Sequence, residues 1–575
     1  MLGSIARKGC QVLADPVLRC WMLRRALKLE AAPPAFQAGR PPYLRFSAVA
    51  PENAQWNGAG PLSDFPLPAA PIRIALAGTD VELSPGDPGA LFRRRYDDLE
   101  TMLSAHRFAW VPVAGRRADR SWVAALWTAW MEDFGDEPAG WPWHPYTATE
   151  RAINIIDFAR RHGLPGDPEK TVAALARHAQ AIAANLEYFG EHYTSNHLAN
   201  NGRGLLRIGT ALGMDECIRM GLDILVAEAD RIFGTSGVLC EASTHYHLLL
   251  ARNYADAWLE ADHAALPEAA ILRDVAARAL AAAPALRLSG GLPLIGDISP
   301  DCPPAYLAGL ASTGARDESG SGWPGGLEPD RRAAFEALRA MTGETAREAI
   351  SGDGWHRFGT EGWDALAFVP EDGWVPMPGH GHQDLGAFEL HHGEERVVVD
   401  PGRGSYGPAA ADRFYQSSAA HAGLTVDGED PAPVNRPYYS DAFRRRIVPD
   451  APHVKYAEST VTLNHSGYRR LRGVGSVTRT WHFRPAAVTV SDRVEGQGTR
   501  RIARKIVTPY QVRLENGRAN IDTGTARFRI SMGAAISAEE TVCWTAYGAG
   551  TPGTALTVAQ SAPLPFDGTI TIERL

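Results

Sequence analysis

The spacing of apolar residues changes near residue 350, and this change constrains the fold more than any other feature of the chain. Between about residues 88 and 345, apolar side chains recur every three or four positions, as in ATERAINIIDFARRHG (148–163) and DECIRMGLDILVAEADRIFG (215–234). From about residue 354 onward they alternate with polar ones and are often β-branched, as in RVVVD, AVTVSD and TITIERL. The first spacing predicts amphipathic helices and the second predicts short strands. We therefore expect an all-helical half followed by an all-strand half.

The order of these elements also indicates how each half packs. A long series of helices can stack as antiparallel pairs around a centre, which gives a toroid or a solenoid. Many short strands with no helices between them favour a β-sandwich. A chain of 575 residues is too long for one hydrophobic core, so two large domains are expected. We predict a leading segment over residues 1–87, a helical domain over 88–350 and an antiparallel β-sandwich over 351–575.

Composition narrows the class of partner. A hydrophobic content of 45% with 22% charged residues is typical of a folded globular protein. The net charge of −8 argues against a nucleic-acid partner, and an anionic polymer would need a local basic groove. Arginine clusters at residues 93–95, 444–446 and 469–472 could supply such a groove, or they could be ordinary surface arginines.

The remaining bulk features concern location and cysteine chemistry. No stretch approaches the ~20 apolar residues of a membrane-spanning helix, and the first 30 residues lack the apolar core of a secretory signal. Residues 12–29 instead predict an amphipathic leading helix. A cytoplasmic location is the default expectation, and a periplasmic one would apply if a signal had been removed. The six cysteines form no CxxC pair, so neither a zinc finger nor a disulfide framework is expected.

Two polar patches interrupt the helical half, at residues 192–206 and 236–258. In the first, Asn196 and His197 follow Ser195 at an apparent helix start, which is a capping context. In the second, the triplet His245, Tyr246 and His247 leads directly into an apolar run, with Glu241 just upstream. Taken singly, these are ordinary capping groups. Taken together, an amide, a carboxylate, a tyrosine and several histidines at helix starts suggest one functional face.

Such a set suits the β-elimination of a uronic-acid polymer. That reaction requires neutralisation of the C5 carboxylate, removal of the C5 proton and protonation of the leaving oxygen. Asn and His donors can stabilise the charge on the carboxylate. A tyrosine, with an ordinary pKa of about 10, gives a phenolate basic enough to remove the proton and a phenol that can return it to the leaving oxygen.

The strand half contains a second constellation, this one with metal-binding character. His380 and His382 lie two residues apart, so on an extended strand they would face the same way. Asp400 ends the strand VVVD and His421 precedes the strand LTV. Histidines with an aspartate around an open position suit zinc. Asp384 could orient one of these histidines, and the adjacent pair at residues 391 and 392 is a competing set of ligands.

Several of these segments together resemble the heparinase II/III family of polysaccharide lyases. The matching segments occur in the family's order and are WHPYTATERAINII (143–156), SNHLANNGRGLL (195–206), EASTHYH (241–247), GHGHQDLGAFEL (379–390), VVVDPGRGSY (397–406) and AHAGLTVDG (420–428). The succession HxHxD, Asp-Pro-Gly and Ala-His is the most specific part of the resemblance. One position differs, because Ala422 stands where the family often has asparagine.

The resemblance implies an incomplete (α/α) toroid joined to an antiparallel β-sandwich, with the active site between them. It implies Tyr246 as general base and acid, His380 as second catalytic group, and Asn196 or His197 as the carboxylate neutraliser. A structural zinc ion would be held by His382, Asp400 and His421. The expected substrate-binding residues are Glu241, Arg203, His245 and His247.

The expected substrate is an acidic polysaccharide or oligosaccharide, and two other functions remain open. A glycoside hydrolase on a similar toroid could use Glu241 and Asp384 as paired carboxylates. A non-catalytic polysaccharide-binding protein of an exopolysaccharide system would keep the groove without turnover. Because no export signal is evident, an enzyme acting on imported oligosaccharides or within polysaccharide biosynthesis fits better than a secreted one. The particular uronate polymer, endo or exo action and the oligomeric state, a homodimer included, are left open.

Overall fold

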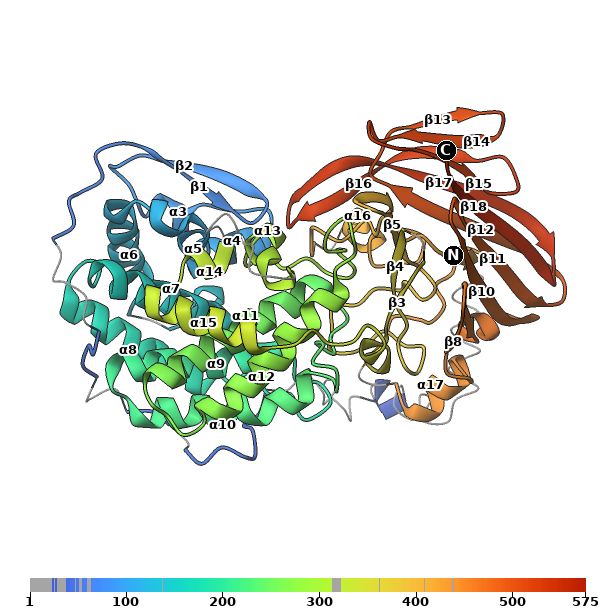
Figure 1. Cartoon of the computed structure of the whole chain (residues 1–575). Helices are drawn as coiled ribbons and strands as arrows, with labels where there is room; N and C mark the ends of the chain where they lie inside the picture. Colours follow the sequence, from blue (N-terminus) through green and yellow to red (C-terminus); the bar gives the residue numbers. More distant parts are fainter. Residues whose placement is uncertain are drawn as a thin grey trace.

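The computed structural model describes residues 38–575 apart from 47, 51–53, 59–63, 137, 313–321, 361, 408 and 437–438, and also residues 23, 24, 26 and 27. The leading helix expected over residues 12–29 lies mostly outside the described residues. Figure 1 shows two lobes, one built of the helices up to α15 and the other of the strands that follow. The change of apolar spacing near residue 350 therefore marks a real change of architecture.

The helical lobe consists of antiparallel helices joined by short connections. Side chains of Asp98, Asp119, Asp167, Ser195 and Ser243 accept hydrogen bonds from backbone N–H groups at the starts of five of them. The helices of eight or more residues are α4 (Leu99–Arg107), α6 (Arg120–Phe134), α7 (Pro145–His162), α8 (Pro168–Ala184), α9 (Asn196–Leu212), α10 (Asp215–Ile232), α11 (Thr244–His263), α12 (Ala269–Ala282) and α15 (Pro329–Met341). Shorter ones are α3 (Ala90–Arg93), α5 (Trp110–Ala114), α13 (Pro304–Leu307) and α14 (Gly322–Gly325).

A β-hairpin precedes these helices, in the segment for which only a leader was expected. Its strands are β1 (Ile72–Leu76) and β2 (Thr79–Leu83), paired antiparallel through Leu76 and Thr79 at the turn. Ile74 and Val81 are buried in the same apolar core as residues of α4, α6 and α7. The hairpin is therefore a packed part of the helical lobe.

The strand lobe contains an eight-stranded sheet, in the order β13-β14-β15-β18-β11-β10-β9-β8, and two four-stranded sheets, β16-β17-β12-β7 and β3-β4-β5-β6. All pairings between these strands are antiparallel, and one apolar core lies between the sheets. The strands are β3 (Trp355–Phe358), β4 (Trp363–Phe368), β5 (Glu389–His392), β6 (Glu395–Val398), β7 (Leu424–Val426), β8 (His453–Ala457), β9 (Thr460–His465), β10 (Val474–Arg484), β11 (Ala487–Gly496), β12 (Thr499–Thr508), β13 (Val512–Glu515), β14 (Arg518–Asp522), β15 (Arg527–Ser531), β16 (Ser537–Ala546), β17 (Ala549–Pro563) and β18 (Phe566–Arg574).

Two short helices, α16 (Ala410–Phe414) and α17 (Asp441–Ile447), interrupt the strand lobe. Within this lobe a buried ion pair fixes the loops that carry the predicted metal ligands. Arg479 on β10 bonds to Asp492 on β11 at 2.6 Å and donates to the carbonyl oxygens of Gly386 and Ala422. Its guanidinium thus ties the sandwich core to the loops that precede β5 and β7, which carry His382 and His421.

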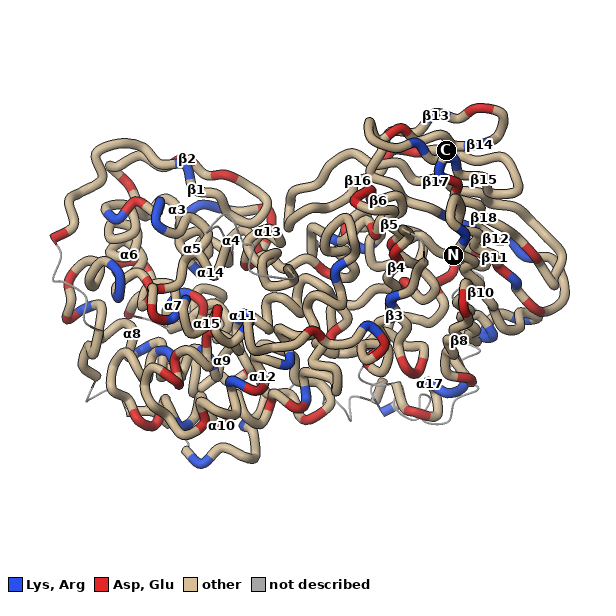
Figure 2. The backbone as a smooth tube through the Cα atoms, viewed as in Figure 1, with Lys and Arg blue, Asp and Glu red and all other residues tan. Residues whose placement is uncertain are grey.

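Charged side chains of both signs are interspersed over both lobes (Figure 2). Each of the three arginine clusters contains an arginine paired with a surface carboxylate, namely Arg93 with Asp133, Arg444 with Asp372 and Arg469 with Asp450. These pairings fit the reading of the clusters as ordinary surface arginines. Among the described residues, no helix has the length and apolar character needed to cross a bilayer.

Candidate active site and metal centre

The starts of helices α9 and α11 bring the two predicted polar patches together. Ser195 caps α9, so Asn196 occupies its first turn with both its backbone N–H and its side-chain Nδ2 free to donate. Both groups bond to Glu241, at 2.8 Å and 2.6 Å respectively. Ser243 caps α11 by accepting from the backbone N–H of Tyr246. The capping predicted from the sequence is therefore confirmed, and it places Tyr246 beside the Asn196–Glu241 pair.

His380 reaches this cluster from the strand lobe, on the loop between β4 and β5. Its ring stacks on that of Tyr246, with centroids 3.4 Å apart and planes inclined by 14°. Its Nε2 lies 3.4 Å from Asn196 Nδ2, and its backbone N–H donates to the carbonyl oxygen of Glu241 at 2.7 Å. Side chains from two helix starts and one sandwich loop thus form a single site between the lobes.

Asp297, which sequence reasoning missed, links this site to the predicted metal ligands. Its carboxylate accepts from His380 Nδ1 at 3.2 Å, His382 Nε2 at 2.9 Å and Arg403 Nη1 at 3.0 Å. Burial alone would raise the pKa of Asp297, but the hydrogen bonds from the two histidines and the charge of Arg403 hold it well below its usual value. Asp297 therefore stays ionised and orients both imidazole rings.

A glycine allows the loop of Asp297 to come this close. Gly296 has a φ of +82°, and a Cβ at this position would lie 2.5 Å from the carbonyl oxygen of Ala242 and 2.8 Å from that of His380. Only glycine fits both the backbone conformation and the space. The Gly-Asp pair is the one local signal that could have pointed to this loop.

Tyr406, also missed, is the hydrogen-bonding partner of Tyr246. The two hydroxyl oxygens are 3.0 Å apart, and the Tyr406 hydroxyl donates to the carbonyl oxygen of Ile298 at 2.8 Å. Burial raises the pKa of Tyr246 well above 10, the carboxylate of Asp301 adds to the rise, and the hydrogen bond with Tyr406 opposes it. Tyr406 ends the segment VVVDPGRGSY, so the resemblance contained it without indicating its role.

His197 lies at the edge of the site and does not contact Tyr246 or His380 through any hydrogen bond or ring contact of the described residues. Its Nδ1 bonds to Glu187 Oε1 at 2.7 Å, its ring packs on Tyr146 at 4.6 Å, and 39% of its side chain is exposed. Burial would lower the pKa of His197, but the Glu187 carboxylate raises it. Of the two residues expected to neutralise the substrate carboxylate, Asn196 is thus the one placed at His380.

Three residues expected to bind substrate are buried and bonded within the protein. Arg203 pairs with Asp256 and Glu150, both at 2.8 Å. The Nδ1 atoms of His245 and His247 accept from backbone N–H groups at 3.0 Å and 3.2 Å. Burial lowers the pKa of His245 to about 3 and that of His247 to about 4, so both are neutral. Their burial and internal bonds favour a structural role in the toroid.

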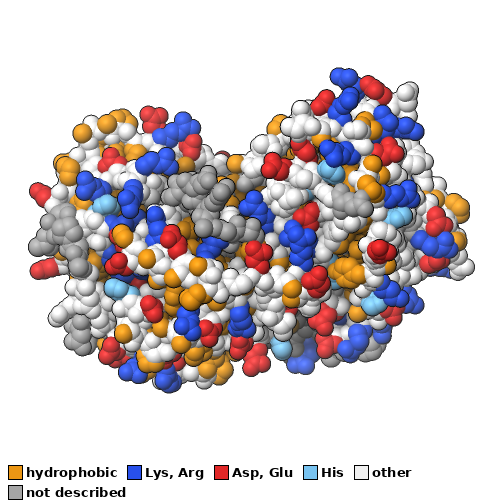
Figure 3. Space-filling view, in the orientation of Figure 1, with side chains coloured by type: hydrophobic (Ala, Val, Ile, Leu, Met, Phe, Trp, Pro, Cys, Tyr) orange, Lys and Arg blue, Asp and Glu red, His pale blue; other side chains and the backbone are white. Residues whose placement is uncertain are grey.

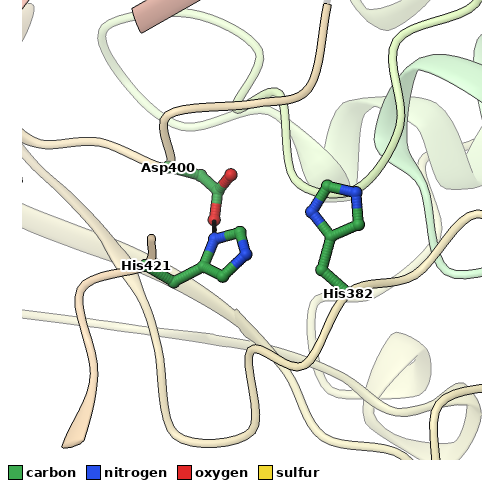
Figure 4. Close-up of side chains that lie close together, drawn as sticks. All are labelled: His382, Asp400 and His421. Atoms are coloured by element: carbon green, nitrogen blue, oxygen red, sulfur yellow. Dashed lines mark hydrogen bonds and ion pairs between the residues drawn. The ribbon is translucent and has the colours of Figure 1, made fainter. Parts of the chain in front are cut away.

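His382, Asp400 and His421 form a buried cluster in which one possible ligand atom of each lies within 4.8 Å of the others. Figure 4 shows His421 bonded to Asp400, through Nδ1 and Oδ2 at 2.7 Å, with His382 facing them. The Nδ1 atom of His382 and the Nε2 atom of His421 are buried without a hydrogen-bond partner. Two imidazoles and a carboxylate with unpartnered nitrogens fit a zinc ion.

Glu389 lies between this cluster and His391 of the competing histidine pair. The backbone N–H of Asp400 donates to Glu389, whose other oxygen bonds to His391 Nε2 at 2.8 Å. His391 Nδ1 accepts from the backbone N–H of Gly290, so both of its ring nitrogens are occupied. Burial beside the Asp400 carboxylate raises the pKa of Asp384 to about 6. In the described part of the chain, the cluster of His382, Asp400 and His421 is the group with metal-ligand spacing.

Comparison with known proteins agrees with this architecture. The family model described as heparinase II/III-like, C-terminal, matches residues 346–570. The solved structure of heparinase III is similar with a TM-score of 0.61 and 14% identity, covering 84% of this chain and 78% of that one. Heparan sulfate lyase HepC from Pedobacter heparinus is similar with a TM-score of 0.51 and 14% identity, covering 84% and 77%. No curated protein matches the chain in sequence.

At such low identity the structural likeness shows the fold, and it confirms the predicted helical toroid followed by an antiparallel β-sandwich. The family match covers the strand lobe, including the loops that carry His380, His382, Asp400 and His421. Residues 346–570 thus match the heparinase II/III-like C-terminal family model, and the chain as a whole has the fold of heparinase III.

Proposed function

We propose that this protein is a polysaccharide lyase that cleaves an acidic, uronate-containing polysaccharide or oligosaccharide by β-elimination. The observation that carries the proposal is the meeting of Tyr246, from the toroid, with His380, from the sandwich, beside Asn196. These three side chains supply a proton-transfer group and two donors for a carboxylate. The similar solved structures include proteins named as heparan sulfate lyases, which act on such a polymer.

Asn196 and His380 are suited to neutralise the C5 carboxylate. The Nδ1 atom of His380 is held by the ionised Asp297, which leaves Nε2 facing Asn196 Nδ2 across 3.4 Å. A substrate carboxylate placed here would accept from Asn196 and, when His380 carries two protons, from its Nε2–H. Hydrogen bonding of the carboxylate spreads its charge and makes the C5 proton more acidic, which is the electrostatic requirement of the reaction.

Tyr246 then transfers the proton. Its phenolate takes the C5 proton, the electrons form the C4–C5 double bond, and the C4–O bond breaks. The same phenol returns the proton to the leaving oxygen, so no water is consumed. Because the pKa of Tyr246 is raised, the resting group is the phenol, so its proton is lost to solvent before the cycle begins and the resulting phenolate needs a hydrogen-bond donor. Tyr406 can provide it by turning its hydrogen from the Ile298 carbonyl toward Tyr246.

The first experiment is near-ultraviolet absorbance during incubation with heparan sulfate, hyaluronate, alginate and acidic bacterial exopolysaccharides. We expect a rise with at least one of them, from the conjugated 4,5-unsaturated uronate. New reducing ends without this rise in absorbance would show hydrolysis and would contradict the proposed lyase function. Binding without either signal would favour the non-catalytic protein. The hydrolase has less support, because Glu241 is held by two bonds from Asn196 while Asp384 is buried next to the metal-type cluster.

A zinc ion held by His382, Asp400 and His421 is the second part of the proposal. When bound, it would fix the loops of residues 380–406 to the start of β7. We expect purified protein to contain about one zinc per chain and His382→Ala to lose it. Because a ligand at a thousandfold excess over its Kd stabilises by about 4 kcal/mol, chelation should lower the melting temperature.

The matched control is His465→Ala, which removes another buried histidine of the strand lobe that is outside the cluster. This variant should keep its zinc even if it melts earlier. Elemental analysis of both variants separates loss of metal from loss of stability. Well-folded wild-type protein without zinc would remove the metal from the proposal.

A further inference from the structure

Two hairpin turns, one from each lobe, meet next to the proposed active site. The turn between β1 and β2 contains Gly78, and the turn between β16 and β17 contains Gly548. A Cβ built on Gly548 would lie 2.0 Å from the Cα atom of Gly78, so the two backbones are in direct contact. Figure 1 shows these turns coming together between the lobes. We call residues 77–78 and 547–548 the bridge.

The bridge is fastened to both lobes by hydrogen bonds. On the helical side, the hydroxyl group of Thr101 in α4 donates to the carbonyl oxygen of Ala77 at 2.7 Å. On the strand side, the backbone N–H of Gly548 donates to the carbonyl oxygen of Gly404 at 2.7 Å. The Tyr547 hydroxyl accepts from the backbone N–H of Tyr406 at 3.1 Å and donates to Asp98 at 3.2 Å. These contacts hold the bridge across the gap between the lobes.

The bridge closes the space on one side of the catalytic tyrosines. The rings of Tyr547 and Tyr406 are 5.1 Å apart, and the hydroxyl of Tyr406 lies 3.0 Å from that of Tyr246. The Tyr406 side chain thus lies between the proposed proton-transfer group and the bridge. In the space-filling view the surface dips between the two lobes (Figure 3).

The other flank of the site is open to solvent. Trp141 is 49% exposed, and the side chains of His144 and His197 are 31% and 39% exposed. These rings lie side by side, with centroids 5.4 Å apart for Trp141 and His144 and 6.4 Å for His144 and His197. Because His197 follows Asn196 in the chain, this aromatic flank leads directly to the carboxylate-binding pair. A sugar chain can therefore reach the site from this flank, whereas the bridge adjoins the site at Tyr406, the hydrogen-bonding partner of Tyr246.

We infer that the protein binds the end of its substrate and cleaves exolytically, releasing small units from a chain terminus. This inference rests on the proposed lyase function. A polymer that crosses the site in both directions would have to pass through the bridge, whose backbone is in contact and bonded to both lobes. A terminal unit needs only to reach Tyr246 from the open flank.

The test follows product size and double-bond formation together, using the polysaccharide that gives the largest absorbance rise. Exolytic action predicts that absorbance rises while viscosity falls slowly, and that fluorescently end-labelled oligosaccharides shorten by one constant unit. A rapid fall in viscosity early in the absorbance rise would overturn the inference and leave the lyase standing. No absorbance rise with any polymer would contradict both the proposed lyase function and exolytic cleavage.

A pair of glycine variants tests whether the bridge is the cause. Gly548→Asp should force the turns apart, and the number of internal cuts per double bond should rise severalfold. Gly517→Asp is the control, because Gly517 has a similar φ of +71° and open space around its Cβ position. That substitution introduces the same backbone strain, and the variant should keep the wild-type product pattern. Identical patterns for Gly548→Asp and wild type, with both proteins folded and active, would contradict the role of the bridge.

Discussion

Replacing Tyr246 by Phe should reduce turnover by about 10³-fold, within the range that a positioned acid–base group contributes. The substitution removes one oxygen atom, the one that is proposed to take the C5 proton and to protonate the leaving oxygen. The ring remains, so its stacking on His380 and its packing in the core of the toroid are preserved. The rate of absorbance rise measures the loss, and a melting curve shows that the fold is retained.

Tyr254→Phe is the matched control for this experiment. Tyr254 lies on the same helix, is fully buried, and its hydroxyl donates to the carbonyl oxygen of Leu225 at 3.0 Å. Losing this bond should cost about 1 kcal/mol of stability and leave the rate unchanged. Near-normal turnover by Tyr246→Phe would exclude Tyr246 as the proton-transfer group, whereas equal losses in both variants would indicate damage to α11 instead.

Acidification from pH 7 to pH 5 should destabilise the protein through its buried histidines. Burial lowers the pKa values of His106, His245 and His465 to about 3. In the unfolded chain their pKa is about 6.5. Below that value the unfolded state binds protons that the folded state does not, so stability is lost as pH falls from about 6.5 toward 3. At 1.36 kcal/mol per pH unit for each group, the three together remove about 6 kcal/mol by pH 5.

Groups with raised pKa values act in the opposite direction. His197 and His421, and Asp384 with its pKa of about 6, bind protons more readily in the folded state and offset part of this loss. Urea unfolding of His465→Gln isolates one contribution, because the variant cannot titrate at that position. Its loss of stability between pH 7 and pH 5 should be about 2 kcal/mol smaller than that of wild type. An equal loss in both proteins would show that His465 is not buried in its neutral form.

The sequence alone determined the two-part architecture and much of the site. The periodicity of apolar residues decides which face of a helix or strand is buried. Because that information is local, the change from helical to strand periodicity near residue 350 could be recognised in the sequence. Capping is local as well, which is why Ser195 marked the start of α9 correctly. The family resemblance narrowed the candidate metal ligands to His382, Asp400 and His421, and the structure brings ligand atoms of these three within 4.8 Å of one another.

Only the tertiary structure showed Asp297 and Tyr406, the burial of Arg203 and the contact of Gly78 with Gly548. Asp297 lies in a loop without periodicity, and its three partners come from positions 83 to 106 residues away in the chain. Arg203 is one of several arginines whose exposure depends on whether carboxylates from other helices reach it, as Asp256 and Glu150 do. The packing of the two lobes decides which loops meet. This packing depends on many weak contacts between segments that are far apart in the chain, and no short stretch of sequence encodes them.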